Sequence, residues 1–169
     1  AEYGTITGMA MPIVLFPATF LTAVSGLLIP EFSRYYVKKD YLKIKKYSDK
    51  LIVVSFLFAL FLTFLYIIFG NKLGEIIYND TQVGIYIKMF APLIPFMYVD
   101  IVVDNILKGL DAQVNVLFIN IIDLLVSISF IFFFVPAFGI KGFIASIFAS
   151  EILNFGLSLK KLLDLEKSW

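Results

Sequence analysis

The stretch LIVVSFLFALFLTFLYIIF, from Leu51 to Phe69, contains no charged side chain. A helix needs about 20 residues to cross the roughly 30 Å hydrocarbon core of a bilayer. Backbone groups have no water to bond there, so a single chain segment crosses as a helix. This stretch therefore predicts a transmembrane helix.

Similar apolar stretches lie on both sides of it. The expected spans cover residues 5–29, 51–69, 83–107, 114–135 and 139–159. We expect the second to end at Gly70-Asn71 and the fourth to stop at Pro136. No stretch shows the two-residue alternation of a half-buried strand. The sequence therefore predicts an all-α membrane protein of about five transmembrane helices.

The composition supports this class and argues against others. Of the 169 residues, 60% are hydrophobic and 16% charged, whereas soluble domains have about 25% charged residues. The chain has no His and no Cys, the side chains that most often act as bases, nucleophiles and metal ligands. No phosphate-binding loop, paired-acid site or metal cluster is present. We expect no enzyme activity, no metal, no organic cofactor and no nucleic-acid partner.

The basic residues are unevenly distributed. The segment 31–50 is predicted to be a basic loop that contains Arg34, Lys38, Lys39, Lys43, Lys45, Lys46 and Lys50. With Lys108, Lys160, Lys161 and Lys167, eleven of the 14 basic residues fall on one side of an up-and-down bundle. Lys72, Lys88 and Lys141 fall on the other. Since basic loops stay in the cytoplasm, we expect the N-terminus outside and the C-terminus in the cytoplasm.

Two interpretations of the basic segment remain open. Val37, Tyr41 and Ile44 recur at helical spacing, which indicates a short helix lying on the inner leaflet. The simpler interpretation is an orientation signal that anchors the chain to headgroups. The alternative is a surface that attracts an anionic lipid-linked substrate, at about 1 kcal/mol per cation.

Two of the expected spans carry paired prolines. These are Pro12 and Pro17 in the first span, and Pro92 and Pro95 in the third. Proline removes a backbone donor and clashes with the preceding turn, so we expect kinks. The freed carbonyls need a neighbouring donor or a water-filled cavity. Such kinks favour a mobile transporter over a rigid scaffold.

Asp123 is the main candidate for a functional residue. It lies roughly 13 Å into its span, and ionisable groups at that depth normally face a cavity or a partner. Asn120 and Ser127 are spaced so that all three oxygens point to one side of the helix. The cluster can hold a sodium ion or carry a proton, or it can form a structural hydrogen bond between helices.

Further polar residues occur in the third and fifth spans. Glu151 lies near mid-membrane with Asn154 one turn on, and they have the same two interpretations. Asp100 and Asp104 share a helix face nearer the cytoplasmic end, and Asp100 is a further candidate for ion coupling or substrate binding. Lys108 lies one further turn on, so Asp104 and Lys108 form either an interfacial ion pair or, as the simpler interpretation, a solvated helix end.

Several motifs occur in an order that resembles a known family. They are YGTITGMAMP (3–12), FPA (16–18), LIPEFS (28–33), AP (91–92), LKGL (107–110) and PAFGIKG (136–142). This set resembles the stage V sporulation protein B family of polysaccharide biosynthesis flippases, in the MOP (MATE-like) exporter superfamily. The resemblance implies two lobes of six helices, with our spans as helices eight to twelve. Residues 1–169 would then be a partial C-terminal lobe that partners the N-terminal lobe of a longer bacterial protein.

The resemblance also implies a function. Related flippases couple transport to a cation through an acidic residue and an Asn in helix eleven, on which Asn120 and Asp123 lie. The expected activity is movement of a lipid-linked oligosaccharide or peptidoglycan precursor across the cytoplasmic membrane, driven by Na⁺, H⁺ or the membrane potential. The alternatives are a MATE-like cation-coupled multidrug exporter and a non-transporting scaffold in envelope assembly.

Overall fold

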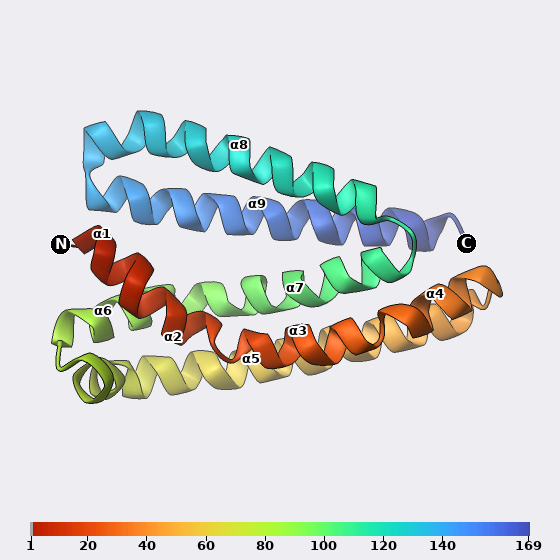
Figure 1. The fold of residues 1–169 in the computed structure, drawn as a ribbon, viewed down its shortest axis with the longest axis horizontal. Coiled ribbons are helices and arrows are strands. Elements are labelled where there is room, and N and C mark those ends of the chain that lie inside the picture. Colours follow the sequence, from red (N-terminus) through yellow and green to blue (C-terminus); the bar gives the residue numbers. More distant parts are fainter. Residues whose placement is uncertain (1) are drawn as a thin grey trace.

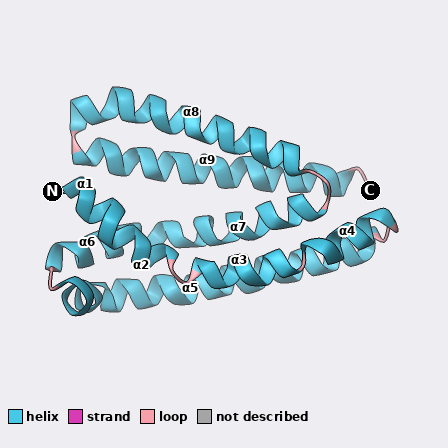
Figure 2. Ribbon diagram, in the orientation of Figure 1, coloured by secondary structure: helices cyan, strands magenta, loops and turns pink. Residues whose placement is uncertain are grey.

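The computed structural model describes residues 2–169, which are helical almost throughout and contain no strand (Figures 1 and 2). In chain order the elements are α1 (Glu2–Thr5), the π-helical turn η1 (Ile6–Ala10), α2 (Met11–Leu15), α3 (Ala18–Leu27), α4 (Ile29–Val37), α5 (Tyr41–Tyr78), α6 (Thr81–Phe90), the 3₁₀ turn η2 (Ala91–Leu93), α7 (Ile94–Gly109), α8 (Gln113–Phe138) and α9 (Ile140–Lys167).

Four helical segments are long and apolar enough to cross a membrane: Tyr41–Tyr78, Thr81–Gly109, Gln113–Phe138 and Ile140–Lys167. The pair Glu2–Leu15 and Ala18–Val37 makes a fifth, bent by 50° at its break. The fold is therefore the expected all-α membrane bundle.

The spans run up and down, with the two termini at opposite ends (Figure 1). The α4–α5 turn, the α7–α8 turn and the C-terminus share one end, and the α5–α6 and α8–α9 turns share the other. The segments with eleven of the 14 basic residues therefore meet at one end, which we call the basic end.

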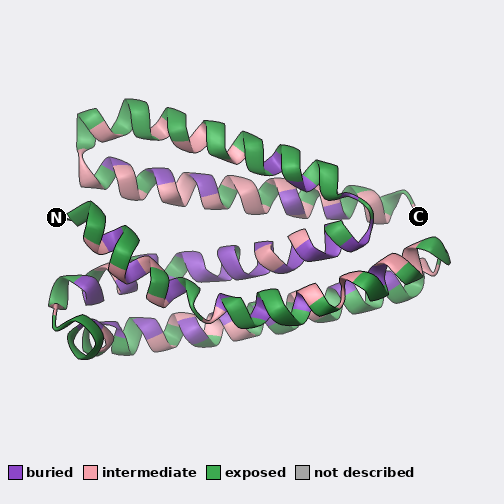
Figure 3. Ribbon diagram, viewed as in Figure 1, coloured by how far each residue is buried: buried purple, intermediate pink, exposed green. Residues whose placement is uncertain are grey.

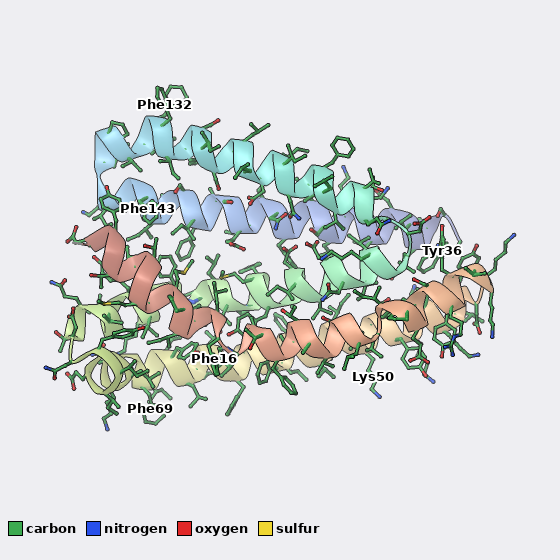
Figure 4. The ribbon with its side chains drawn as sticks, in the orientation of Figure 1. Phe16, Tyr36, Lys50, Phe69, Phe132 and Phe143 are labelled. Atoms are coloured by element: carbon green, nitrogen blue, oxygen red, sulfur yellow. The ribbon has the colours of Figure 1, made fainter. Side chains whose placement is uncertain are left out.

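The centre of the bundle is α7. It packs against α3, α4, α5 and α9, and its buried residues include Tyr98, Val103 and Ile106 (Figure 3). In contrast, α8 packs mainly along α9 and leaves most of its side chains exposed. Phe132 of α8 points away from the bundle and is 72% exposed (Figure 4). Such an apolar outer surface suits lipid.

The break in the first span lies at Phe16-Pro17, between α2 and α3. Pro17 has no N–H for the carbonyl four residues back, which is that of Ile13. The Tyr66 hydroxyl donates to this carbonyl at 2.8 Å, and the Tyr98 hydroxyl donates to the Val14 carbonyl at 2.5 Å. The bend is thus held by two side-chain donors from α5 and α7.

A similar arrangement occurs in the third span. Pro92 lies in the 3₁₀ turn η2, and Pro95 is in the first turn of α7. The carbonyl four residues before Pro95 belongs to Ala91, and the Thr63 hydroxyl donates to it at 3.1 Å. Pro12 lies in the first turn of α2, two residues after the end of the π-helical turn η1.

The basic segment 31–50 is not a loop, which corrects the prediction. Only residues 38–40 separate α4 from α5, which is continuous for 38 residues. Asp40 caps α5, and the buried Ile44 and Ser48 form the inner side of its first turns. Hydropathy marks where a helix leaves the hydrocarbon, whereas the helix itself continues until a turn ends it.

Two other predicted ends are also wrong. α5 passes Gly70 and Gly74, because these glycines let it pack closely on α6 rather than ending it: a Cβ on Gly74 would lie 2.5 Å from the Gly84 nitrogen. α5 ends where Asn79 takes a left-handed φ of 53°. α8 passes through Pro136 and ends at Gly139, with φ 58°.

Candidate functional site: a polar seam between three helices

A row of polar side chains runs along α9 where it faces α7 and α8. We call it the polar seam, and its members are Asp100, Asp104, Asp123, Ser127, Ser150, Asn154 and Ser158. Three of them lie on α9 at four-residue intervals, which places them on one helix face. Each α9 member hydrogen-bonds to a neighbouring helix, so the seam joins three spans.

The part of the seam farthest from the basic end joins α8 to α9. The Ser150 hydroxyl donates to Oδ1 of Asp123, and the Ser127 hydroxyl donates to Oγ of Ser150 at 2.8 Å. Asp123 and Ser127 are half-buried, whereas Ser150 is buried. Asp123 and Ser127 thus share a face, as expected, and both converge on a serine that the sequence did not single out.

The middle of the seam joins α7 to α9. Nδ2 of Asn154 donates to Oδ2 of Asp100 at 2.8 Å, and Asp100 is only 6% exposed. Oδ1 of Asp100 and Oδ1 of Asn154 are both buried and have no hydrogen-bond partner within residues 2–169. Two acceptor oxygens are therefore unsatisfied at the centre of this bundle.

The part of the seam nearest the basic end again joins α7 to α9. The Ser158 hydroxyl donates to Oδ1 of Asp104 at 3.1 Å. The predicted Asp104–Lys108 ion pair is absent from the described residues. Lys108 instead lies 3.5 Å from Oδ1 of Asn105, whose Nδ2 donates to Ser25 Oγ at 2.7 Å. Asp104 faces α9 because Ser158 offers it a donor there.

Two predicted site residues do not join these hydrogen bonds. Asn120 is exposed, and its side chain has no partner in residues 2–169, so the expected cluster of Asn120, Asp123 and Ser127 oxygens does not form. Asn120 lies about 60° around α8 from Asp123, but it is on the exposed side of the α8–α9 contact, where no polar side chain of α9 reaches it. Glu151 is half-buried without a hydrogen bond, but its carboxyl interacts electrostatically with Asp123 and Asp100.

The seam brings several carboxyl groups into one electrostatic environment. Asp100 interacts with the carboxyls of Asp104, Glu151 and Asp123. Within residues 2–169, no three acidic side chains are placed to hold one metal ion. A site of this kind can bind protons on its carboxyls, or recruit a monovalent cation to one carboxylate together with neighbouring hydroxyl and amide oxygens.

Several of the predicted basic residues lie apart from the polar seam, at the basic end. Lys43, Lys45, Lys46 and Lys50 are exposed on the first turns of α5. Lys43 pairs with Asp40 at 2.8 Å. The hydrogen bond from Lys43 holds the pKa of the Asp40 carboxyl below its usual value of 3.8.

Comparisons with known proteins agree with this architecture. The MatE family model matches residues 1–133. The chain is 22% identical, over 154 residues, to Stage V sporulation protein B of Bacillus subtilis (strain 168). The match covers 90% of this chain but about 30% of the length of that relative. No solved structure matches. Because the family match covers well over half of a helical bundle with several membrane-spanning segments, the chain belongs to the MatE family of membrane transporters.

Proposed function

We propose that this chain is part of a flippase that moves a lipid-linked oligosaccharide or peptidoglycan precursor across a bacterial cytoplasmic membrane. The observation that carries a transport function is the polar seam, which holds three carboxyl groups between membrane-spanning helices. Ionisable groups in a membrane cost about 2.5–3.5 kcal/mol each on insertion scales and normally mark ion or substrate pathways.

The lipid-linked substrate is supported by the ordered motifs of the sequence and by the similarity to Stage V sporulation protein B. The exposed lysines of the basic end add an attraction for anionic headgroups. The N-terminal lobe that would complete the substrate path is the expected partner within the same longer protein.

We further propose that the polar seam couples transport to Na⁺, H⁺ or the membrane potential. Asp123 is central to this proposal, because it receives the Ser150 hydrogen bond and interacts with Glu151. Asn154 lies one helical turn after Ser150 on α9, and it and its partner Asp100 supply two further unsatisfied oxygens.

The test uses the full-length protein in proteoliposomes that contain a fluorescent lipid-linked saccharide. Flipping is measured as the fraction of the fluorophore that a membrane-impermeant quencher cannot reach. The measurement is made with a sodium gradient, with a proton gradient and with an imposed membrane potential. We expect flipping that one of these gradients accelerates. Absence of flipping under all of them, together with resistance to cationic drugs in cells, would instead indicate a multidrug exporter.

The proposed orientation puts the basic end in the cytoplasm. In a cysteine-free full-length protein, Asn79→Cys in the α5–α6 turn should react with an impermeant maleimide in intact cells. Asp111→Cys in the α7–α8 turn should react only after permeabilisation. The reverse labelling pattern would invert the proposed topology.

A further inference from the structure

The outer surface of α8 and α9 forms a groove of about 220 Å³ near the basic end. From α8 it is lined by Asn115, Phe118, Ile119 and Ile122, and from α9 by Leu157, Lys160, Lys161 and one carboxylate, that of Asp164. The α8 residues recur at intervals of three and four, as do those of α9, so each helix contributes a single face. The groove is therefore built by regular packing of two antiparallel helices.

Polar and apolar residues are separated along this groove. Asn115 lies in the first turn of α8, and Lys160 and Lys161 lie near the end of α9, so all three approach the basic end. Ile122 and Leu157 lie further into the span. Phe118, between these two zones, is 60% exposed. The groove thus changes from cationic to apolar in the direction in which a bilayer changes from headgroups to acyl chains.

The two lysines carry charge that this part of the chain does not neutralise. Within residues 2–169 the only ion pair of the neighbouring Asp164 is with Lys167, at 4.0 Å, and neither Lys160 nor Lys161 has one. Ammonium groups on flexible stems bind phosphate well as point charges. Basic pockets between spans at this depth are suited to anionic lipid headgroups.

Another groove of the molecule lacks this combination. The groove between α6 and α9 at the opposite end has a single cation, Lys141, beside Tyr86 and Met89. The α6–α9 groove therefore offers a comparison in which one lysine, rather than two, lies beside an apolar wall.

We propose that the α8–α9 groove binds one anionic phospholipid, with its phosphodiester between Lys160 and Lys161 and an acyl chain along Phe118, Ile122 and Leu157. The side-chain amide of Asn115 offers a further donor to the headgroup. This site is separate from the polar seam, and its lipid would be a bound component rather than the transported substrate.

The test measures lipid binding to the purified full-length protein by native mass spectrometry, with phosphatidylglycerol and phosphatidylcholine as probes. Wild-type protein should retain phosphatidylglycerol in preference to phosphatidylcholine. Each lysine near an anionic lipid contributes about fivefold in affinity. The Lys160→Gln/Lys161→Gln variant should therefore bind phosphatidylglycerol about 25-fold more weakly, and Lys141→Gln should bind it as wild type does.

A second variant separates binding from folding. Asp164→Asn removes a negative charge at the edge of the groove and should strengthen phosphatidylglycerol binding several-fold, which a folding defect would not do. Equal retention of both lipids by wild type, or unchanged binding by the double lysine variant, would overturn the proposal. Displacement of the lipid by millimolar inorganic phosphate would also overturn it, since the site would then recognise a free anion.

Discussion

Asn154 on α9 and Asp100 on α7 are joined by one hydrogen bond, while the second oxygen of each side chain is buried and unpaired. A carboxylate offers acceptors only, and an amide offers both a donor and an acceptor. The pair therefore has one donor too few when Asp100 is ionised. A proton on Oδ1 of Asp100 would supply that donor to the Asn154 carbonyl oxygen and close a second hydrogen bond.

This shortage of donors predicts how α7 and α9 respond to substitution. Asp100→Asn supplies a permanent N–H in nearly the same shape, so the thermal stability of the purified full-length protein should be retained or rise. Asp100→Leu leaves both polar groups of Asn154 unpaired and should lower the free energy of unfolding by about 1–3 kcal/mol. Thermal unfolding in detergent measures whether Asp100→Asn is at least as stable as wild type and Asp100→Leu is less stable. If Asp100→Leu is as stable as Asp100→Asn, the pair does not hold the two helices together.

The proposed coupling role of the seam predicts a transport defect for Asp123→Ala and for Glu151→Ala. Alanine lacks the carboxyl that would carry the coupling ion, so gradient-driven flipping should fall about tenfold or more, which corresponds to a barrier raised by about 1.4 kcal/mol. Asn120→Ala is the matched control, because it lies on the same helix without a side-chain partner. Wild-type flipping by both acidic variants would remove the seam from the coupling mechanism.

Hydropathy was sufficient to predict the number and order of the spans, but it could not predict where the helices end. Lys43 and Lys50 looked like loop residues because they are charged, yet they form the first turns of α5 beyond its apolar part. Gly70 looked like a helix end because glycine often is one, but its role is close packing against α6. Helix ends depend on turn geometry at residues such as Asn79, and hydropathy carries no information about that.

The candidate site was predicted in part. Depth in the membrane singled out Asp123 and Glu151, with Asn154 one turn on, and the hydrogen bonds of Asp123 and Asn154 do lie between helices. The serines that bind the carboxyls were missed, although Ser146, Ser150, Asn154 and Ser158 form a four-residue series along α9 that would have indicated a polar face. Which carboxyl each one meets depends on the register between helices, and a single sequence does not contain that register.

The tyrosines at the Pro17 bend lead to a prediction about stability. Tyr66→Phe and Tyr98→Phe each leave a backbone carbonyl of the bend without its donor, and each should lower the free energy of unfolding by about 1–3 kcal/mol. Tyr78→Phe is the control on α5, because its hydroxyl has no partner within residues 2–169. The measurement is thermal unfolding of the full-length protein. Equal melting temperatures for all three variants would mean that water or lipid replaces the lost donors.

The Asp40–Lys43 pair at the start of α5 predicts a pH dependence of stability. Because Lys43 lowers the pKa of Asp40 below its usual 3.8, the stabilisation is present above that value and is lost as the pH falls through the folded-state pKa. Asp40→Asn keeps an acceptor for the Lys43 backbone N–H but cannot ionise. The wild type should therefore melt at a higher temperature than Asp40→Asn at pH ~7, and the difference should shrink as the pH falls below about 3.8, the usual pKa of an aspartate. High salt should reduce the difference at pH ~7, since the pair is exposed. A difference that stays constant across this pH range would contradict a charge-dependent contribution from Asp40.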